Sequence, residues 1–322
     1  MTAAEIAAAR RNQVPRGIFF MVLSTVMFSA VNAIVKWELA RYPVGEVAFC
    51  RSVFAFSTVA IIVLPHSGWG VLRTRRYREH LQRGVSQFGS MCCMFLALRM
   101  LTLGSATAIS FSAPLFTTLL SIVLLKEKVG VHRWSALVVG FIGVLVVTHP
   151  GAESLNYGAF FALANAILIS SVAVAIRHMS TTESIATLTL YQMAIITFCS
   201  LFLLPLGFRV PGWADMAGLA FAGIGNGIAQ IWWTRSLSLA PPSAVVPFNY
   251  LSLLWATILG FAIWGDVPTA SLLVGAAIVV ASGLYILWRE TRRRPGRVAA
   301  IAAPPAAAPL PLRLWRRRAP PS

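Results

Sequence analysis

Long apolar segments, separated by short polar loops, run through most of the chain. A helix that crosses the hydrocarbon core of a bilayer needs about 20 mainly apolar residues. The pattern predicts ten such helices. The first five are Gly17–Lys36, Val44–Leu64, Arg83–Leu101, Ser105–Leu125 and Trp134–Thr148, and the last five are Tyr157–Ile176, Ile185–Leu206, Met216–Leu237, Pro242–Trp264 and Thr269–Trp288. The predicted fold is therefore an all-α polytopic membrane protein with ten transmembrane helices.

The two ends of the chain lie outside this pattern. Residues 1–16 are predicted to form a short cytoplasmic tail, and residues 290–322 are rich in Arg, Ala and Pro without an amphipathic period. Such a composition is typical of a disordered basic tail that touches anionic lipid. The first apolar segment is longer than the core of a signal peptide, so we interpret it as a retained helix.

The composition agrees with a membrane protein. Hydrophobic residues make up 57% of the chain, charged residues only 11%, and the mean hydropathy is +0.74. Soluble domains carry about 25% charged residues. A soluble protein is therefore excluded as the starting interpretation.

The basic residues indicate how the helices are oriented. Cytoplasmic loops of membrane proteins are enriched in Lys and Arg. If the N-terminus is cytoplasmic, most of the 27 basic residues fall in cytoplasmic loops and tails; the exceptions are Lys36, Arg41, Arg51, Arg99 and Arg209. Both termini are therefore predicted to be cytoplasmic, and the net charge of +17 requires no nucleic-acid partner.

The chain contains an internal repeat. The stretch "LRMLTLGSATAISFSAPLFTTLLSI" (98–122) aligns with "TRSLSLAPPSAVVPFNYLSLLWATI" (234–258), and the segment from Gly17 aligns with the segment from Gly158. Each half, 17–149 and 157–289, then holds five helices. Five is an odd number, so the second half enters the membrane from the opposite side. Inverted repeats of this kind are typical of secondary transporters that work by alternating access.

The repeats also resemble a known family. "AISFSAPLFTTLLSIVLLKEK" followed by "WSALVVGFIGVLVV" is similar to the end of an EamA repeat of the drug/metabolite transporter superfamily, with Pro114, Glu127 and Gly143 at the matching positions. The second half repeats the pattern in "PFNYLSLLWATILGFAIWGDVPTASLLVGAAIVVASG", where Asp266 replaces the usual Glu. The resemblance implies a ten-helix transporter.

A narrower resemblance concerns the substrate. "VGEVAFCRSVFAF", "FSAPLFTTLL" and "VVGFIGVLVVTHP" are similar to bacterial uptake members that carry cofactor-like metabolites such as S-adenosylmethionine or riboflavin. Amino-acid and drug/metabolite exporters share the fold and remain the alternative. The resemblance implies a multi-pass protein of the bacterial inner membrane whose partners are a small-molecule substrate, the bilayer and, optionally, a second copy of the chain in a homodimer.

Enzymatic signatures are scarce. The five histidines fall in loops or at the ends of predicted helices, and the sequence has no HExxH motif, phosphate-binding glycine loop or GxSxG motif. The four cysteines form no CxxC pair. An integral membrane enzyme is therefore disfavoured, and no cofactor or metal is expected. A channel or a sensor stays open.

Polar residues within the spans are candidates for substrate contact, because a polar group is costly in hydrocarbon. Asn226, Gln230 and Trp233 share one face of span 8 at i, i+4 and i+7. In span 3, the repeat partner of span 8, Gln87 is the corresponding candidate. Hydrogen bonds that only hold helices together are the alternative for each of them.

The other polar residues within the spans leave more than one interpretation open. Arg51 in span 2 binds a substrate carboxylate or phosphate, pairs with Glu46, or extends its charged head to the outer surface. Asn32 and Asn165 serve either function or packing. None of the acidic residues is central in a span, so facilitated diffusion or exchange is as plausible as proton coupling; Glu46 is the nearest candidate for a relay.

The stretch "PFNYLSLLW" (247–255) places a helix breaker and polar groups inside a span. Proline removes a backbone donor and bends a helix, so Pro247 and its counterpart Pro114 are predicted hinges. Asn249 and Tyr250 are predicted substrate contacts, as is Ser110 in span 4. The cavity is expected to be lined chiefly by spans 3, 4, 8 and 9, with spans 1, 2, 6 and 7 forming moving walls.

Overall fold

The computed structural model describes residues 14–125, 131–148, 157–179, 182–207, 209–240 and 245–293. The first half contains α2 (Val14–Leu39), α3 (Val44–Ser67), the 3-10 helix η1 (Trp69–Leu72), α4 (Tyr77–Met100), α5 (Leu103–Ser110), α6 (Ala113–Leu125) and α7 (Val131–Thr148). The second half contains α8 (Tyr157–Met179), α9 (Ile185–Leu201), the 3-10 helix η2 (Leu204–Leu206), α10 (Trp213–Leu239), the 3-10 helix η3 (Val246–Tyr250), α12 (Leu251–Trp264) and α13 (Ala270–Arg293). Every regular element of the described residues is a helix, which confirms the all-α prediction there.

Some predictions fall outside these ranges. Residues 1–13 and 294–322 of the two predicted tails, together with Glu127, lie outside the described residues. Helix α13 continues to Arg293, so the first four residues assigned to the C-terminal tail are helical.

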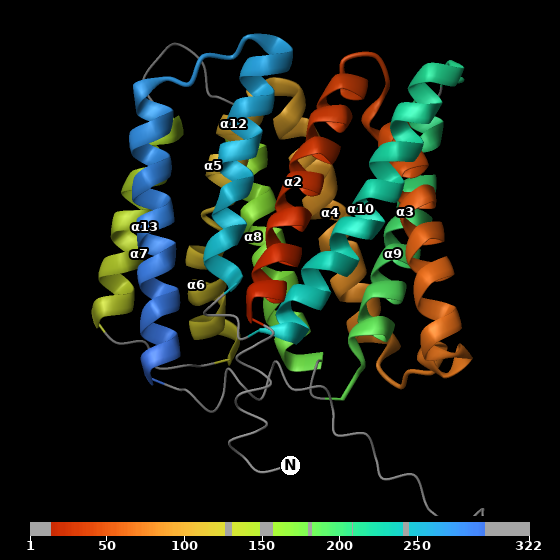
Figure 1. Ribbon diagram of the computed structural model, residues 1–322, viewed down its shortest axis with the longest axis horizontal. Coiled ribbons are helices and arrows are strands. Elements are labelled where there is room, and N and C mark those ends of the chain that lie inside the picture. Colours follow the sequence, from red (N-terminus) through yellow and green to blue (C-terminus); the bar gives the residue numbers. More distant parts are fainter. Residues whose placement is uncertain are drawn as a thin grey trace, which may run out of the picture.

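The helices run side by side in one bundle (Figure 1). The start of α2 and the end of α13 both lie toward the lower edge of the view (Figure 1). Five helical stretches are long and apolar enough to cross a membrane; they are Val14–Leu39, Val44–Pro65, Leu103–Leu120, Tyr157–Ile176 and Pro247–Trp264. Helices α4 and α10 are also long, with 24 and 27 residues, but their polar side chains lower their hydropathy. The chain is therefore a multi-pass membrane protein.

Two of the predicted spans are broken. Span 4 is divided into α5 and α6, which are separated by Phe111 and Ser112, and span 9 begins as η3 before α12 follows. Pro114 lies in the first turn of α6 and Pro247 lies in η3. Proline at the start of a helix is tolerated, whereas in a helix interior it removes one backbone hydrogen bond. The prolines therefore lie beside interruptions of both segments.

The most extensive helix contacts join the two halves of the sequence. Helix α2 packs on α10, α4 packs on α8, and α7 packs on α13. Glycines of α10 allow neighbouring helices to approach closely. A Cβ on Gly223 would lie 2.5 Å from the backbone oxygen of Arg51 in α3, and one on Gly225 would lie 3.1 Å from the sulfur of Met27 in α2. Side chains at these positions would push α10 away from both neighbours.

Candidate functional site

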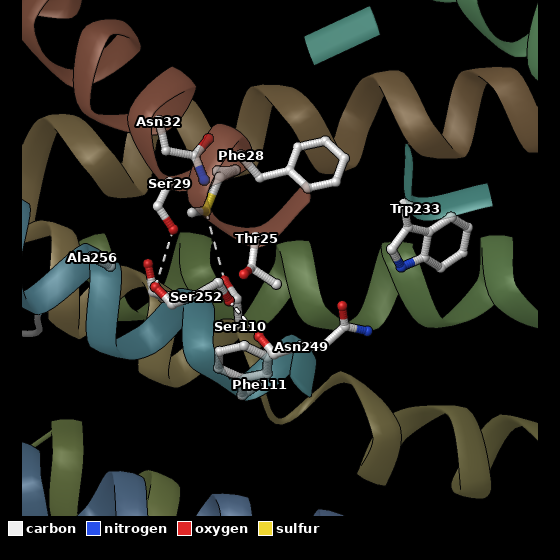
Figure 2. Close-up of a pocket in the computed structure, with 12 residues that line it drawn as sticks. Thr25, Phe28, Ser29, Asn32, Ser110, Phe111, Trp233, Asn249, Ser252 and Ala256 are labelled. Atoms are coloured by element: carbon white, nitrogen blue, oxygen red, sulfur yellow. Dashed lines mark hydrogen bonds between the residues drawn. The ribbon is translucent and has the colours of Figure 1, made fainter. Parts of the chain in front are cut away.

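A cavity of about 270 Å³ lies inside the bundle, between elements of both halves (Figure 2). Its lining combines hydroxyl and amide groups with aromatic rings. The lining residues are Thr25, Phe28, Ser29 and Asn32 of α2, Met94 of α4, Thr107 and Ser110 of α5, Phe111, Trp233 of α10, Asn249 of η3, and Ser252 and Ala256 of α12. Ligand sites in proteins have this character: mostly apolar walls with a few placed polar groups.

The two broken segments supply one wall of the cavity. Helix α5 begins at a cap in which the Thr102 hydroxyl accepts from the backbone N–H of Ser105, and it ends at Ser110. Ser110 and Phe111 therefore lie at the break itself. Asn249 lies in η3, at the other break. Because the helices stop here, side chains at their ends line the cavity instead of packing along a continuous helix.

A buried hydrogen-bond network holds Ser110 in place. The Ser90 hydroxyl of α4 donates to the amide oxygen of Asn165 in α8 at 2.6 Å. The Asn165 amide nitrogen in turn donates to the Ser110 hydroxyl oxygen at 3.0 Å, and that hydroxyl donates to the backbone oxygen of Ala106 at 2.8 Å. Asn165 is therefore an interhelical link whose last member is a cavity residue.

Helix α2, expected only as a moving wall, supplies four of the lining residues. The Ser29 hydroxyl donates to the backbone oxygen of Ser252 in α12 at 3.2 Å. Figure 2 shows this bond between Ser29 and Ser252, with Trp233 at the far side of the cavity. The missed signal is a face of α2 on which Thr25, Ser29 and Asn32 recur at i, i+4 and i+7.

Three of the predicted contacts lie at the cavity: Ser110, Trp233 and Asn249. Tyr250 instead packs its ring on Phe111, with centroids 4.9 Å apart, and its hydroxyl lies where a Cβ on Gly283 of α13 would be. Gln230 is half-buried on α10, and Gln87 is half-buried on α4; neither is among the lining residues.

Arg51 and Asn226 contact each other away from the lining. The Arg51 guanidinium donates to the Asn226 amide oxygen at 3.4 Å and to the sulfur of Met91 at 3.3 Å. It also lies 5.2 Å from the centre of the Phe95 ring. Glu46 accepts from the backbone N–H of Arg209 at 3.0 Å, so the suggested pair with Arg51 is not formed.

Comparison with known proteins places these features in a family. The profile described as the EamA-like transporter family matches residues 15–149 and again residues 156–288. A solved crystal structure, 18% identical in sequence, superposes with a TM-score of 0.58 over 88% of this chain and 99% of its own chain. That similarity supports the fold alone.

Several similar proteins are named as transporters. The chain is 29% identical over 279 residues to an S-adenosylmethionine uptake transporter of Rickettsia conorii, covering 86% of this chain and 94% of the relative. It is 28% identical over 280 residues to a riboflavin transporter of Rhizobium johnstonii, covering 86% and 92%. It is also 27% identical over 268 residues to the pseudopaline exporter CntI of Pseudomonas aeruginosa, covering 83% and 94%.

Proposed function

Because the chain belongs to the EamA-like transporter family, we propose that it is a bacterial inner-membrane secondary transporter that moves a small metabolite by alternating access. The observation that carries this proposal is the cavity between the two halves, lined by polar and aromatic side chains next to both helix breaks. A polar side chain within the membrane is tolerated where it faces such a cavity and not lipid.

The proposed architecture is two inverted five-helix halves, 17–149 and 157–289, with both termini in the cytoplasm. Contacts between the halves support it. The first helix of one half, α2, packs on α10, and the first helix of the other half, α8, packs on α4. Helices α2 and α8 are the first helices of the two halves, and α4 and α10 are the third. Superposition of the repeats therefore turns one pair into the other, as a two-fold relation requires. In this account Pro114 and Pro247 act as hinges that let each broken segment swing.

The best substrate candidate is a cofactor-like metabolite such as S-adenosylmethionine or riboflavin. Relatives named for the transport of both support this choice. Phe28, Phe111 and Trp233 offer faces on which a planar ring stacks, and Asn249 and Ser110 offer hydrogen bonds to its edge. The cavity of about 270 Å³ is at the small end for a ligand site, so such a substrate requires α2 and α12 to move apart.

Arg51 favours a substrate with an anionic group. Its Nε has no hydrogen-bond partner among the described residues, and a buried cation without a counter-charge is costly. Arg51 contacts Met91, and Met94, about one turn further along α4, lines the cavity. A substrate carboxylate that displaces these methionine side chains would satisfy the guanidinium. S-adenosylmethionine has a carboxylate and riboflavin has none.

Complementation tests the substrate. The gene is expressed in bacterial auxotrophs that require external riboflavin or external S-adenosylmethionine, and growth is recorded at limiting supply. We expect rescue of the strain that requires S-adenosylmethionine, and loss of that rescue in Arg51→Gln. Rescue of the riboflavin strain that is insensitive to Arg51→Gln would show that Arg51 does not bind an anionic group of the substrate. Trp232→Ala, next to Trp233 but outside the lining, is the matched control for Trp233→Ala.

Export is the alternative, and one relative favours it, because the similar Pseudomonas aeruginosa protein is named a pseudopaline exporter. Amino-acid or drug/metabolite export then replaces uptake without a change of site. If neither auxotroph is rescued and overexpression confers resistance to toxic amino acids, the export function is supported.

A further inference from the structure

Glu38 is a buried glutamate, one of whose carboxylate oxygens, Oε2, has no hydrogen-bond partner among the described residues. It lies one residue before the end of α2, and its side chain is 3% exposed. It lines a second cavity of about 410 Å³, whose other residues are Ala30, Ala33, Ile34, Trp37, Gly218, Leu259 and Ile263. An ionised carboxylate in such surroundings is strongly unfavourable.

The neighbouring charged groups do not neutralise Glu38. In the turn after α2, Arg41 pairs with Asp215 of α10 at 2.8 Å, and the Tyr42 hydroxyl donates to the same carboxylate at 2.7 Å. Asp215 thus takes both donors and repels a charge on Glu38. The hydrogen bond to Asp215 also raises the pKa of the Tyr42 phenol, so Tyr42 stays protonated at neutral pH.

The remaining charged groups near this end face elsewhere. The Lys36 ammonium donates to the backbone oxygens of Leu98 and Leu101 at the end of α4. The carboxylate of Asp266, beyond α12, attracts the same ammonium electrostatically. Glu46 of α3 is also buried, and its Oε1 has no partner among the described residues. Its Oε2, however, accepts from the Arg209 backbone N–H at 3.0 Å, whereas no side-chain or backbone donor among the described residues reaches the Glu38 carboxylate. Helix α12 contributes only Leu259 and Ile263 to this second cavity.

We propose that Glu38 is the proton-binding site of the transport cycle and carries one proton per cycle across the membrane. The inference rests on the proposed transport function and names its coupling ion. In this proposal the carboxyl group is protonated in the state described here, because its side chain is buried and no described donor reaches its Oε2 atom. When α2 and α12 separate, water reaches Glu38; the O–H bond breaks, the proton passes to that water as hydronium, and Glu38 remains as the carboxylate. A proton from water on the other side restores the carboxyl group.

The geometry connects this proton to the substrate cavity. Ser29 and Asn32 of α2 line the substrate cavity, whereas Ala33 and Trp37 of the same helix line the cavity of Glu38. Helix α12 is shared in the same way, with Ser252 at one cavity and Leu259 at the other. A movement of α2 relative to α12 therefore changes both cavities at once. Such a shared two-state element is what coupling between two sites requires.

The test uses the full chain in proteoliposomes that contain a trapped pH dye. Labelled riboflavin and labelled S-adenosylmethionine are the probes. Counterflow without a pH gradient reports carrier activity, and accumulation under a pH gradient reports coupling. With one proton per substrate, a pH difference of about one unit supports up to about tenfold accumulation when no net charge moves. The direction of the pH gradient that drives accumulation distinguishes symport of substrate and proton from their exchange.

We expect gradient-driven accumulation and substrate-dependent dye change in the wild type and in Glu38→Asp, which keeps an ionisable group. Both signals are lost in Glu38→Gln, which retains measurable counterflow. Glu46→Gln is the matched control, since it neutralises another buried glutamate, and it keeps both signals. Wild-type counterflow that is insensitive to a pH gradient, or coupling that survives in Glu38→Gln, overturns the proposal. Loss of wild-type counterflow for both probes contradicts instead the proposed function.

The melting temperature in detergent tests the proposal without reconstitution, in case Glu38→Gln inserts poorly into liposomes. Ionisation of the buried carboxyl group destabilises this state, so the wild type should melt at a lower temperature in detergent at about pH 8 than at about pH 6. Glu38→Gln should lose most of that difference, and Glu46→Gln should keep it. An equal pH dependence in all three proteins counts against the proposal.

Discussion

Replacement of Asn165 by alanine should weaken both the bundle and substrate binding, although Asn165 does not line the substrate cavity. The amide accepts from Ser90 at 2.6 Å and donates to Ser110 at 3.0 Å. Asn165→Ala removes both bonds and leaves the Ser90 hydroxyl, which is 1% exposed, without its side-chain acceptor. The same change frees the cavity residue Ser110 to turn.

The magnitude follows from measured hydrogen bonds between transmembrane helices, which average about 0.6 kcal/mol and reach about 1.7 kcal/mol. Two such bonds give a loss of roughly 1–3 kcal/mol in the free energy of unfolding for Asn165→Ala. For substrate binding, a loss of about 1 kcal/mol at Ser110 corresponds to a roughly fivefold rise in KM. The maximal rate should change less, because the moving helices are untouched.

A double-mutant cycle isolates the link. The free energy of unfolding is measured by detergent titration for Ser90→Ala, Asn165→Ala and the double variant, and we expect a coupling of about 0.6–1.7 kcal/mol. Ser171→Ala is the control, because its hydroxyl donates to the Leu168 backbone oxygen of its own helix, α8. The control cycle combines Ser171→Ala with Asn165→Ala, and its two effects should add within about 0.3–0.5 kcal/mol. If Ser90→Ala and Asn165→Ala are additive to the same extent, the bond between them does not stabilise the bundle and the reasoning is refuted.

The contacts of three further residues predict the effects of their substitution. Gly283→Ala should destabilise the protein by about 1–3 kcal/mol, because the new Cβ would overlap the Tyr250 hydroxyl; Tyr250→Phe should restore part of the loss in the same detergent titration, and no rescue would place the clash elsewhere. Lys36→Met should cost about 1.5–3 kcal/mol, since its ammonium donates charge-assisted bonds to the end of α4; an unchanged unfolding curve contradicts this. Asp215→Asn should cost less than about 1 kcal/mol, because the Arg41 side chain is 51% exposed, and a larger loss would show that this pair closes the bundle.

Much of the fold follows from hydropathy, and the reasons for the exceptions are local. Helix α4 begins at Tyr77, six residues before the predicted start of span 3. Its first turns are polar, but Arg83 is buried and donates to the Leu188 backbone oxygen of α9. A hydropathy profile counts such a residue as a boundary, whereas the fold buries it against a partner that is distant in sequence.

The candidate site was partly predictable, for similar reasons. Proline and amide residues within apolar spans drew attention to the two breaks, and Ser110, Trp233 and Asn249 lie at the cavity. Asn249 and Tyr250 were both expected to face the substrate. Neighbouring residues of any helix point about 100–120° apart, so Asn249 and Tyr250 point in different directions, and Tyr250 packs on Phe111 instead. The face of α2 was missed because Thr25, Ser29 and Asn32 also suit plain helix packing.

The central claim is that a substrate binds in the cavity between the two halves and is carried across the membrane. Counterflow into proteoliposomes loaded with unlabelled S-adenosylmethionine or riboflavin tests it most directly. The account predicts saturable, transient accumulation of one labelled compound by the wild type and by Trp232→Ala, and a clear rise in KM for Asn249→Ala and Trp233→Ala. Chemical conversion of the label without accumulation, or equal transport by the cavity variants and the control, would contradict it.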